Sequence, residues 1–354
     1  MADDTALEAF RFANRAMALQ RRNTAIAAAR AGREDDHASY REAYDEIHAK
    51  GKEGASRRPF QLAFVLLDLD SLSRPGHPRP SDDFALRPVP VPAPLDELFG
   101  DVRQVERLRE ARALIGFTRL DAPDPESPEI ATRMDLSRAT QNWVPASEVR
   151  GEGVFLRVRD DLMAQRVARM EKSPQMEVHR EAYGRFRANR RSDRKTSDFA
   201  PFHGWPGARY IALHTLSHLL IRTIARECGY SSAFLAERIY AGDEQNPRTG
   251  ILIYTAVPES EGTLGGLVSL AEEREFGRIV RRALADAGHC SADPLCPERL
   301  PHDPGDYLHG AACHVCLFVS ETTCERGNRF LDRRFLVPLS GDKEQVLTPA
   351  GLLP

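Results

Sequence analysis

The first 70 residues carry apolar side chains at intervals of three and four, which predicts a helical N-terminal region. Residues 5–31 form the first expected helix, and Thr5 with Glu8 makes a capping box at its start. Residues 58–67 form a later helix, which is apolar along most of its length and begins with a proline. We therefore expect residues 1–70 to be one helical region.

Proline dominates the next segment, residues 71–94, where few side chains could pack into a core. Such a composition is typical of an extended linker. Residues 95–200 then mix both periodicities, so we expect an intermediate region there. Its predicted elements are a short charged helix at 95–113, strand-like residues 114–120, a strand at 149–158, and a long charged helix or helical pair at 163–194.

Residues 201–340 form a third predicted region, in which helices with one apolar face surround a buried strand. The expected elements are a helix at 209–227 ended by Gly229, a helix at 231–240 capped by serines, a strand at 250–257, and a helix that continues through Ala285. Helices around a short sheet, followed by a cysteine-rich zinc loop, indicate a mixed α+β fold within the α/β class. Residues 341–354 are left as a tail.

The composition is that of a globular protein. Hydrophobic residues make up 42% and charged residues 29% of the 354 residues, enough for one or two domains. No apolar run approaches the ~20 residues that a membrane span requires, and the acidic start Met1–Asp4 is unlike a signal peptide. We therefore expect a cytoplasmic protein without a membrane partner.

Five of the six cysteines lie between residues 290 and 324, in the pattern C-x5-C-x16-C-x2-C-x7-C. In a reducing compartment such a cluster is more typical of metal binding than of disulfides. A C-x2-C knuckle lets two thiolates reach one zinc ion from a single turn, and Cys313 with Cys316 supplies it. A redox C-x2-C would instead open a helix after a strand, and this sequence context lacks that arrangement. The pattern therefore favours zinc.

One closed zinc site is expected from these residues. Its predicted ligands are Cys313, Cys316 and Cys324, with the fourth from Cys296 or Cys290. We prefer Cys296 because it is nearer in sequence. Four such ligands complete a tetrahedral shell, which indicates a structural Zn²⁺.

Three histidines give a weaker indication of a metal site than the cysteines do. His214 and His218 lie one helical turn apart, as the ligands of zinc peptidases do, but Thr215 stands where the glutamate of that motif would be. Their neighbours are leucines, so the pattern favours histidines of the hydrophobic core. His314, inside the knuckle, could be a metal ligand, but a residue in such a position more often faces solvent.

No catalytic residue is predicted. The sequence contains no G-x4-G-K-[ST] motif, so the backbone cradle that ATP hydrolysis needs is missing. Residues 45–48 spell the helicase tetrapeptide Asp-Glu-Ile-His, but we expect them to lie in a polar helix at residues 36–49, and no P-loop lies upstream. The glycine-rich segment 262–266 follows two acids that would repel phosphate, which favours a tight turn.

A basic run at residues 185–195 is the candidate contact with nucleic acid. Its six cations are Arg185, Arg187, Arg190, Arg191, Arg194 and Lys195. Such side chains neutralise DNA phosphates, but charge runs are also common on solvated surfaces, and the two interpretations are equally open.

Several segments between Tyr210 and Val337 carry a family resemblance. They are LHTLSHLLI (213–221), ECGYSSAFLAERIY (227–240), ILIYTAVPESEGTLGGL (251–267), CSADPLC (290–296) and GAACHVCLFVSETTCERGNRFLDR (310–333). Together they resemble the MrfA-type zinc-binding domain, which is found in MrfA-like helicases and in the DrmB component of DISARM phage-defence systems. LREARALIGFTRL (108–120) and WVPASEVRGEGVFLRV (143–158) are similar to the stretch that precedes this domain in DrmB-like proteins.

The resemblance implies zinc ligation by Cys313, Cys316, Cys324 and one upstream cysteine, and a role in DNA handling within a defence or repair complex. The N-terminus is similar to a different class. AFRFANRAMALQRR (9–22) and RPFQLAFVLLDL (58–69) resemble the leader of DrmA-like DISARM helicases, in which Gln61 would correspond to an adenine-sensing glutamine. A P-loop follows in those proteins and the Pro-rich segment follows here, so ATPase activity is not implied.

Three functions are consistent with these patterns. The preferred one is a non-enzymatic zinc-binding accessory protein of a DISARM-like defence or repair helicase system, which binds DNA or a helicase partner. The second is a remnant or subunit of an ATP-dependent helicase whose motor is supplied by another chain. The third is a structural scaffold without nucleic-acid binding.

Overall fold

The computed structural model describes residues 84–113, 117–118, 133–134, 146–189, 200–229, 231–242, 245–255, 266–301, 308–339 and 346–353. The helices expected in residues 1–70, with Gln61, lie outside the described residues. The chain divides into two compact units, one of residues 1–63 and 111–147 and the other of residues 64–110 and 148–354. The first unit contains the antiparallel pair β3 (Phe117–Thr118) and β4 (Arg133–Met134).

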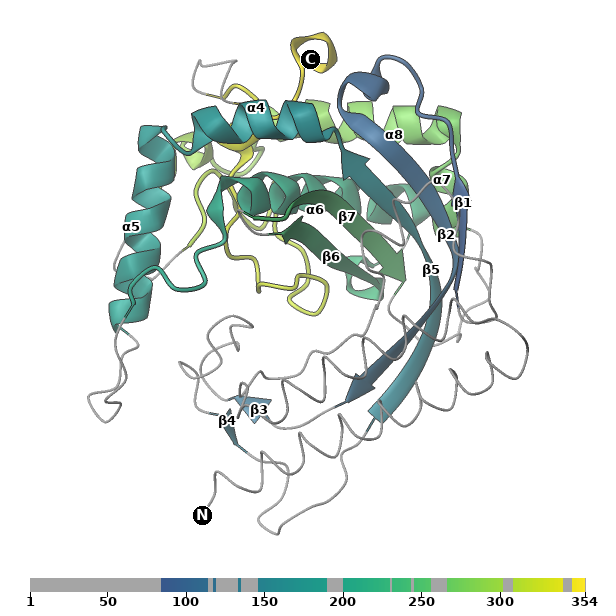
Figure 1. Ribbon diagram of the computed structural model, residues 1–354, viewed down its shortest axis with the longest axis horizontal. Coiled ribbons are helices and arrows are strands. Elements are labelled where there is room, and N and C mark those ends of the chain that lie inside the picture. Colours follow the sequence, from purple (N-terminus) through teal and green to yellow (C-terminus); the bar gives the residue numbers. More distant parts are fainter. Residues whose placement is uncertain are drawn as a thin grey trace. The chain divides into compact units, whose positions relative to one another are not determined.

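A five-stranded sheet in the order β1-β2-β5-β7-β6 runs through the second unit (Figure 1). Its strands are β1 (Phe84–Pro88), β2 (Phe99–Ala113), β5 (Ala146–Val158), β6 (Leu235–Gly242) and β7 (Pro247–Thr255). The pairs β1–β2, β5–β7 and β6–β7 are antiparallel. Residues 84–88, which the proline pattern assigned to an extended linker, thus form the edge strand of this sheet.

Alternate residues of β7 face opposite sides of the sheet. Ile251 and Ile253 belong to the large core that also contains the helices, whereas Leu252 and Tyr254 pack with Phe155 in a smaller cluster. This alternation follows from the two-residue period of a strand, and it explains why the strand reads as a continuous apolar run.

Five helices complete the described part of the fold. They are α4 (Asp160–Met170), α5 (Pro174–Asn189), α6 (Gly207–Cys228), α7 (Gly266–Leu270) and α8 (Glu273–Ala287). The helical pair expected at 163–194 is confirmed up to residue 189, where the described part ends. The helix at 209–227 is confirmed, and Gly229 ends α6 with a φ of 70°. The mixed α+β fold class is likewise confirmed.

Two predicted helices are wrong. The segment 95–113 is mostly strand β2, after a single turn of 3-10 helix, because pairing with its neighbours in the sheet overrides the helix propensity of its Arg, Glu and Leu residues. The segment 231–240 holds one 3-10 turn, at Ser232–Phe234, and then strand β6. Ser231 does cap that turn, since its side chain accepts a hydrogen bond from the amide of Ala233.

Helix α6 lies at the centre of the large core, where it packs against β6, β7 and α8. Figure 1 shows it lying across β6 and β7. Along its length most side chains are buried, including polar ones, so both of its sides meet other parts of the protein. No helix within the described ranges is long and apolar enough to cross a membrane.

Candidate metal centre

Two short segments that follow α8 supply a group of four cysteines. Cys290 lies three residues beyond the end of α8, and Cys296 begins the 3-10 turn Cys296–Glu298. Cys313 and Cys316 lie in the knuckle, residues 313–316, which is closed by hydrogen bonds of 3.0 Å from the amides of residues 317 and 318 to the carbonyl of Cys313.

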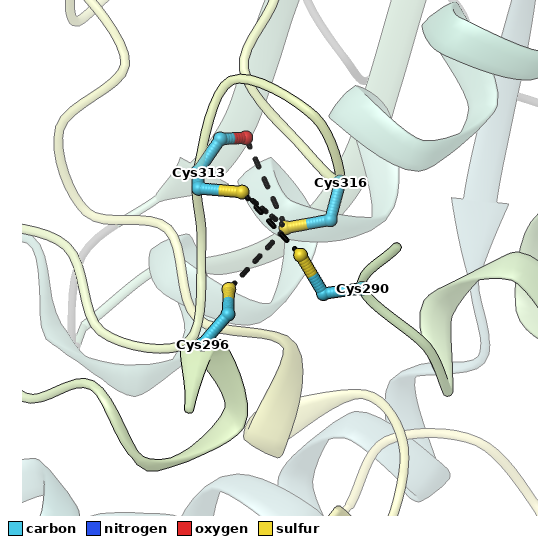
Figure 2. Close-up of side chains that lie close together, drawn as sticks. All are labelled: Cys290, Cys296, Cys313 and Cys316. Carbon is cyan, nitrogen blue, oxygen red and sulfur yellow. Dashed lines mark hydrogen bonds between the residues drawn. The ribbon is translucent and has the colours of Figure 1, made fainter. Parts of the chain in front are cut away.

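The four sulfur atoms converge on one point (Figure 2). The Sγ–Sγ distances are 3.6 Å for Cys290–Cys313, 3.7 Å for Cys296–Cys316 and 3.5 Å for Cys313–Cys316. A tetrahedral zinc ion with Zn–S bonds of about 2.3 Å would hold its sulfurs about 3.8 Å apart. A disulfide would require about 2.05 Å. The spacing therefore fits a thiolate-bound metal and excludes disulfides in this group.

The cysteine pKa values differ because each thiol meets a different environment. Burial raises the pKa of Cys296 to about 11, despite the Cys316 thiol and the Arg333 charge nearby. Burial also opposes ionisation of Cys313, but hydrogen bonds from the backbone of residues 315 and 316 and from neighbouring thiols lower its pKa to about 7. Cys313 thus ionises more readily than Cys296 without a cation, and a bound metal would supply the charge that stabilises all four as thiolates.

Two arginines support the cysteine group from outside. The fully buried Arg333 donates from Nε to the Ala311 carbonyl at 2.9 Å and from Nη2 to the Cys296 sulfur at 3.4 Å. Arg222 of α6 donates from Nη1 to the carbonyl of Phe318 at 2.7 Å and also reaches carbonyls of the knuckle. Outer hydrogen bonds of this kind orient metal ligands, and Arg333 also offsets the negative charge that four thiolates would bring.

The chain enters the knuckle through a crowded turn. A side chain at Gly310 would overlap the carboxylate of Asp332, so only glycine fits there. Asp332 is fully buried and bonds to His179 at 2.8 Å. Its pKa lies well below the usual range because hydrogen bonds from His179 and Arg334 outweigh the cost of burial. This network fixes the position of the backbone just before Cys313.

The predicted ligands are not all brought together. Cys296, Cys313 and Cys316 lie in one group, but its fourth member is Cys290, the alternative, and not Cys324. The grouping expected from sequence therefore needs correction: nearness along the chain favoured Cys324, whereas the turn after α8 returns Cys290 to the knuckle. Grouping the two closely spaced pairs, C-x5-C and C-x2-C, would have predicted these four cysteines from sequence.

Cys324 lies instead with His214, His218 and Glu237 in a second buried group. Both histidines are fully buried. His314 is exposed and packs against Phe318. Sequence reasoning missed Glu237, because its segment was expected to be helical.

The structure describes only part of the basic run. Arg185 lies 3.7 Å from Glu181 on the same helix, and Arg187 is 7% exposed, with its guanidinium 6.0 Å from the Tyr183 ring centroid. The remaining four cations, residues 190, 191, 194 and 195, lie outside the described residues. Burial makes Arg187 a poor candidate for a phosphate contact.

Comparison with known proteins connects this geometry with a family. Residues 216–317 match the model of the MrfA Zn-binding domain, a span that contains all four grouped cysteines and ends before Cys324. The DISARM protein DrmB of Bacillus paralicheniformis is 34% identical over 264 residues, or 72% of this chain. The chain covers only 44% of that relative. The crystal structure of the helicase MrfA bound to DNA aligns with 70% of this chain and 24% of its own, at 10% identity and a TM-score of 0.28, which is too low to compare folds.

Proposed function

Because this chain carries an MrfA Zn-binding domain and is similar to the DISARM protein DrmB, we propose that it is a non-enzymatic, zinc-binding accessory protein of a DISARM-like defence or repair helicase system. In this role it binds DNA or a helicase subunit. The observation that carries the proposal is the four-cysteine group, which lies within the matched domain and has the sulfur spacing of a zinc site.

Cys290, Cys296, Cys313 and Cys316 would hold the zinc ion. Four thiolates close a tetrahedral shell and leave no position for water or substrate, so the metal would be structural. It would join the segment after α8 to the knuckle, which Arg222 connects to α6 through hydrogen bonds to the carbonyls of His314 and Val315. Free energy of zinc binding would then contribute directly to the folding of this domain.

The accessory role is supported by the sequence, which offers no G-x4-G-K-[ST] motif for nucleotide phosphates. A nucleotide-hydrolysis assay tests it. The pure protein should show no turnover with or without DNA. Turnover by the pure chain would contradict the proposal, and turnover only after addition of a helicase subunit that is inactive alone would favour a chain that completes a motor.

DNA binding is tested by salt titration of the affinity for duplex and single-stranded oligonucleotides. Each phosphate contact contributes about one unit to the slope of log K against log salt concentration. Replacing Arg190, Arg191, Arg194 and Lys195 with glutamine should therefore reduce the slope on duplex DNA by up to about four and weaken binding for all sequences alike.

A matched control removes the same charge elsewhere. The arginines at positions 274, 278, 281 and 282 of α8 are exposed, so their replacement with glutamine lowers the net charge equally. If both variants weaken binding to the same extent, the basic run is not the contact. If the unmodified protein binds neither DNA at low salt nor a DISARM helicase subunit in co-elution, the structural-scaffold function is left.

A further inference from the structure

A second group of potential metal ligands lies apart from the four cysteines. His214 and His218 come from consecutive turns of α6, Glu237 from β6, and Cys324 from the loop that follows the knuckle. The two histidines and Glu237 are 0% exposed and Cys324 is 4% exposed. Burial of three ionisable side chains and a thiol at one point is costly unless they neutralise one another or bind an ion.

Their ligand atoms converge as those of a metal site do. His214 Nε2 lies 2.9 Å from Glu237 Oε1 and 3.1 Å from Cys324 Sγ, and His218 Nε2 lies 3.3 Å from the same carboxylate oxygen. Zinc bonds of about 2.0–2.3 Å in a tetrahedron place ligand atoms about 3.3–3.5 Å apart. The observed spacings are at or slightly below that range.

Backbone carbonyls orient both imidazole rings through the ring nitrogen that faces away from the group. Nδ1 of His214 lies 3.3 Å from the carbonyl of Phe330, and Nδ1 of His218 lies 3.1 Å from the carbonyl of Leu317. A carbonyl only accepts, so each Nδ1 donates, and each neutral ring then presents the lone pair of Nε2 to the centre of the group. Donation of the other ring N–H to a backbone carbonyl is the usual environment of a metal-bound histidine.

The two anionic ligands are also supported. The Cys324 sulfur accepts backbone amides from Asn328 at 3.1 Å and Arg326 at 3.4 Å. Asn328 has a φ of 59°, so the loop turns in the left-handed region to aim these amides. Ser217 donates its hydroxyl to Oε2 of Glu237, which leaves Oε1 toward the histidines.

Hydrogen bonds among these four side chains, without a metal ion, explain the arrangement poorly. Without a cation both histidines would have to be charged, because each Nδ1 donates to a carbonyl while each Nε2 faces the Glu237 carboxylate. A single Nε2–H of His214, however, would have to be shared between the carboxylate and the sulfur, which weakens both hydrogen bonds. One divalent cation satisfies all four groups, and its charge balances one carboxylate and one thiolate.

We propose that His214, His218, Glu237 and Cys324 form a second metal site, which binds a zinc-class divalent cation. A thiolate, two imidazoles and a carboxylate suit zinc, and four protein ligands are enough to close a structural shell. The sequence lacked the carboxylate that a zinc-peptidase motif would carry next to His214, and the fold supplies it from β6. The ion would link α6, β6 and the loop after the knuckle.

Metal stoichiometry of the full chain tests this inference, which does not depend on the proposed role in defence. The protein is reconstituted with excess Zn²⁺, freed of unbound metal, and measured by native mass spectrometry and elemental analysis. We expect about two ions per chain. Glu237→Gln and Cys324→Ser should each hold about one, and so should Cys313→Ser, which disables the other site.

The control variant is Thr223→Ala, which changes a buried side chain of the same helix that bonds only to the carbonyl of Leu219 among the contacts described, and it should keep two ions. Substitution with Co²⁺ distinguishes the sites, because Cys324→Ser should remove only the absorption of a site with a single thiolate. One ion in the wild-type protein, lost entirely in Cys313→Ser, would overturn the inference. So would two ions in folded Glu237→Gln and Cys324→Ser. If Cys324→Ser does not fold, the wild-type count and Glu237→Gln decide.

Discussion

Arg333→Lys should destabilise the protein although it preserves the charge. Arg333 is 0% exposed, and its guanidinium uses three nitrogens that point in different directions. Nη1 donates to the carbonyls of Ala287 at 2.7 Å and His289 at 3.0 Å, Nε donates to Ala311 at 2.9 Å, and Nη2 reaches the Cys296 sulfur at 3.4 Å.

A lysine has one nitrogen, so it can replace only one side of this fork. At least one carbonyl and the Cys296 sulfur would lose their partner, and a buried acceptor without a partner costs about 1–3 kcal/mol. We therefore expect Arg333→Lys to lower the free energy of unfolding by about 2–6 kcal/mol. Because Arg333 also orients Cys296, metal bound to the four-cysteine group should pass faster to a competing chelator.

Urea denaturation of metal-loaded protein measures the first effect, and the rate of transfer to a chromophoric chelator measures the second. Arg282→Lys is the matched control, since the side chain of Arg282 is 62% exposed and pairs with Asp286 on the surface. It should change stability by less than about 0.5 kcal/mol. A stability of Arg333→Lys within that same margin of the wild type would refute the assigned role of the guanidinium.

Three further outcomes follow from the same geometry. Cys290→Ser should lower the metal content by about one ion per chain in elemental analysis, and full retention would show that Cys290 is not a ligand. Gly310→Ala should cost about 1–3 kcal/mol in thermal or urea unfolding because its methyl group overlaps Asp332, whereas Gly229→Ala, which meets no neighbouring atom, should cost only its backbone strain of about 1 kcal/mol. Burial lowers the pKa of His309 to about 4, so the folded state favours the neutral ring. In the unfolded chain the ring has the ordinary pKa of about 6.5, so the unfolded state gains a proton first as the pH falls. The free energy of unfolding therefore decreases by up to about 3 kcal/mol between pH ~6.5 and the lower pKa of the folded state. The difference in stability between wild type and His309→Gln should shrink over this interval, and a constant difference from pH 7 to pH 4 would contradict the assignment.

Much of the fold could be predicted where local pattern and tertiary context agree. Helix α6 has long apolar periodicity and a glycine at its end, and β7 is a run of β-branched and aromatic residues, so both were predicted from sequence. Strand β2 and strand β6 were not, because their Arg and Glu residues favour a helix locally, and only hydrogen bonding to neighbouring strands makes them extended.

The candidate metal chemistry could be predicted from the sequence itself, since C-x2-C and C-x5-C restrict two pairs of thiols to short segments whatever the rest of the chain does. Which cysteine, histidine and glutamate side chains lie together was decided by the tertiary structure. The turn after α8 brings Cys290 to the knuckle, and the pairing of β6 with β7 places Glu237 opposite two histidines of α6, with Cys324 completing that group. Sequence separation alone does not predict these contacts, because they depend on packing between elements that are far apart in sequence.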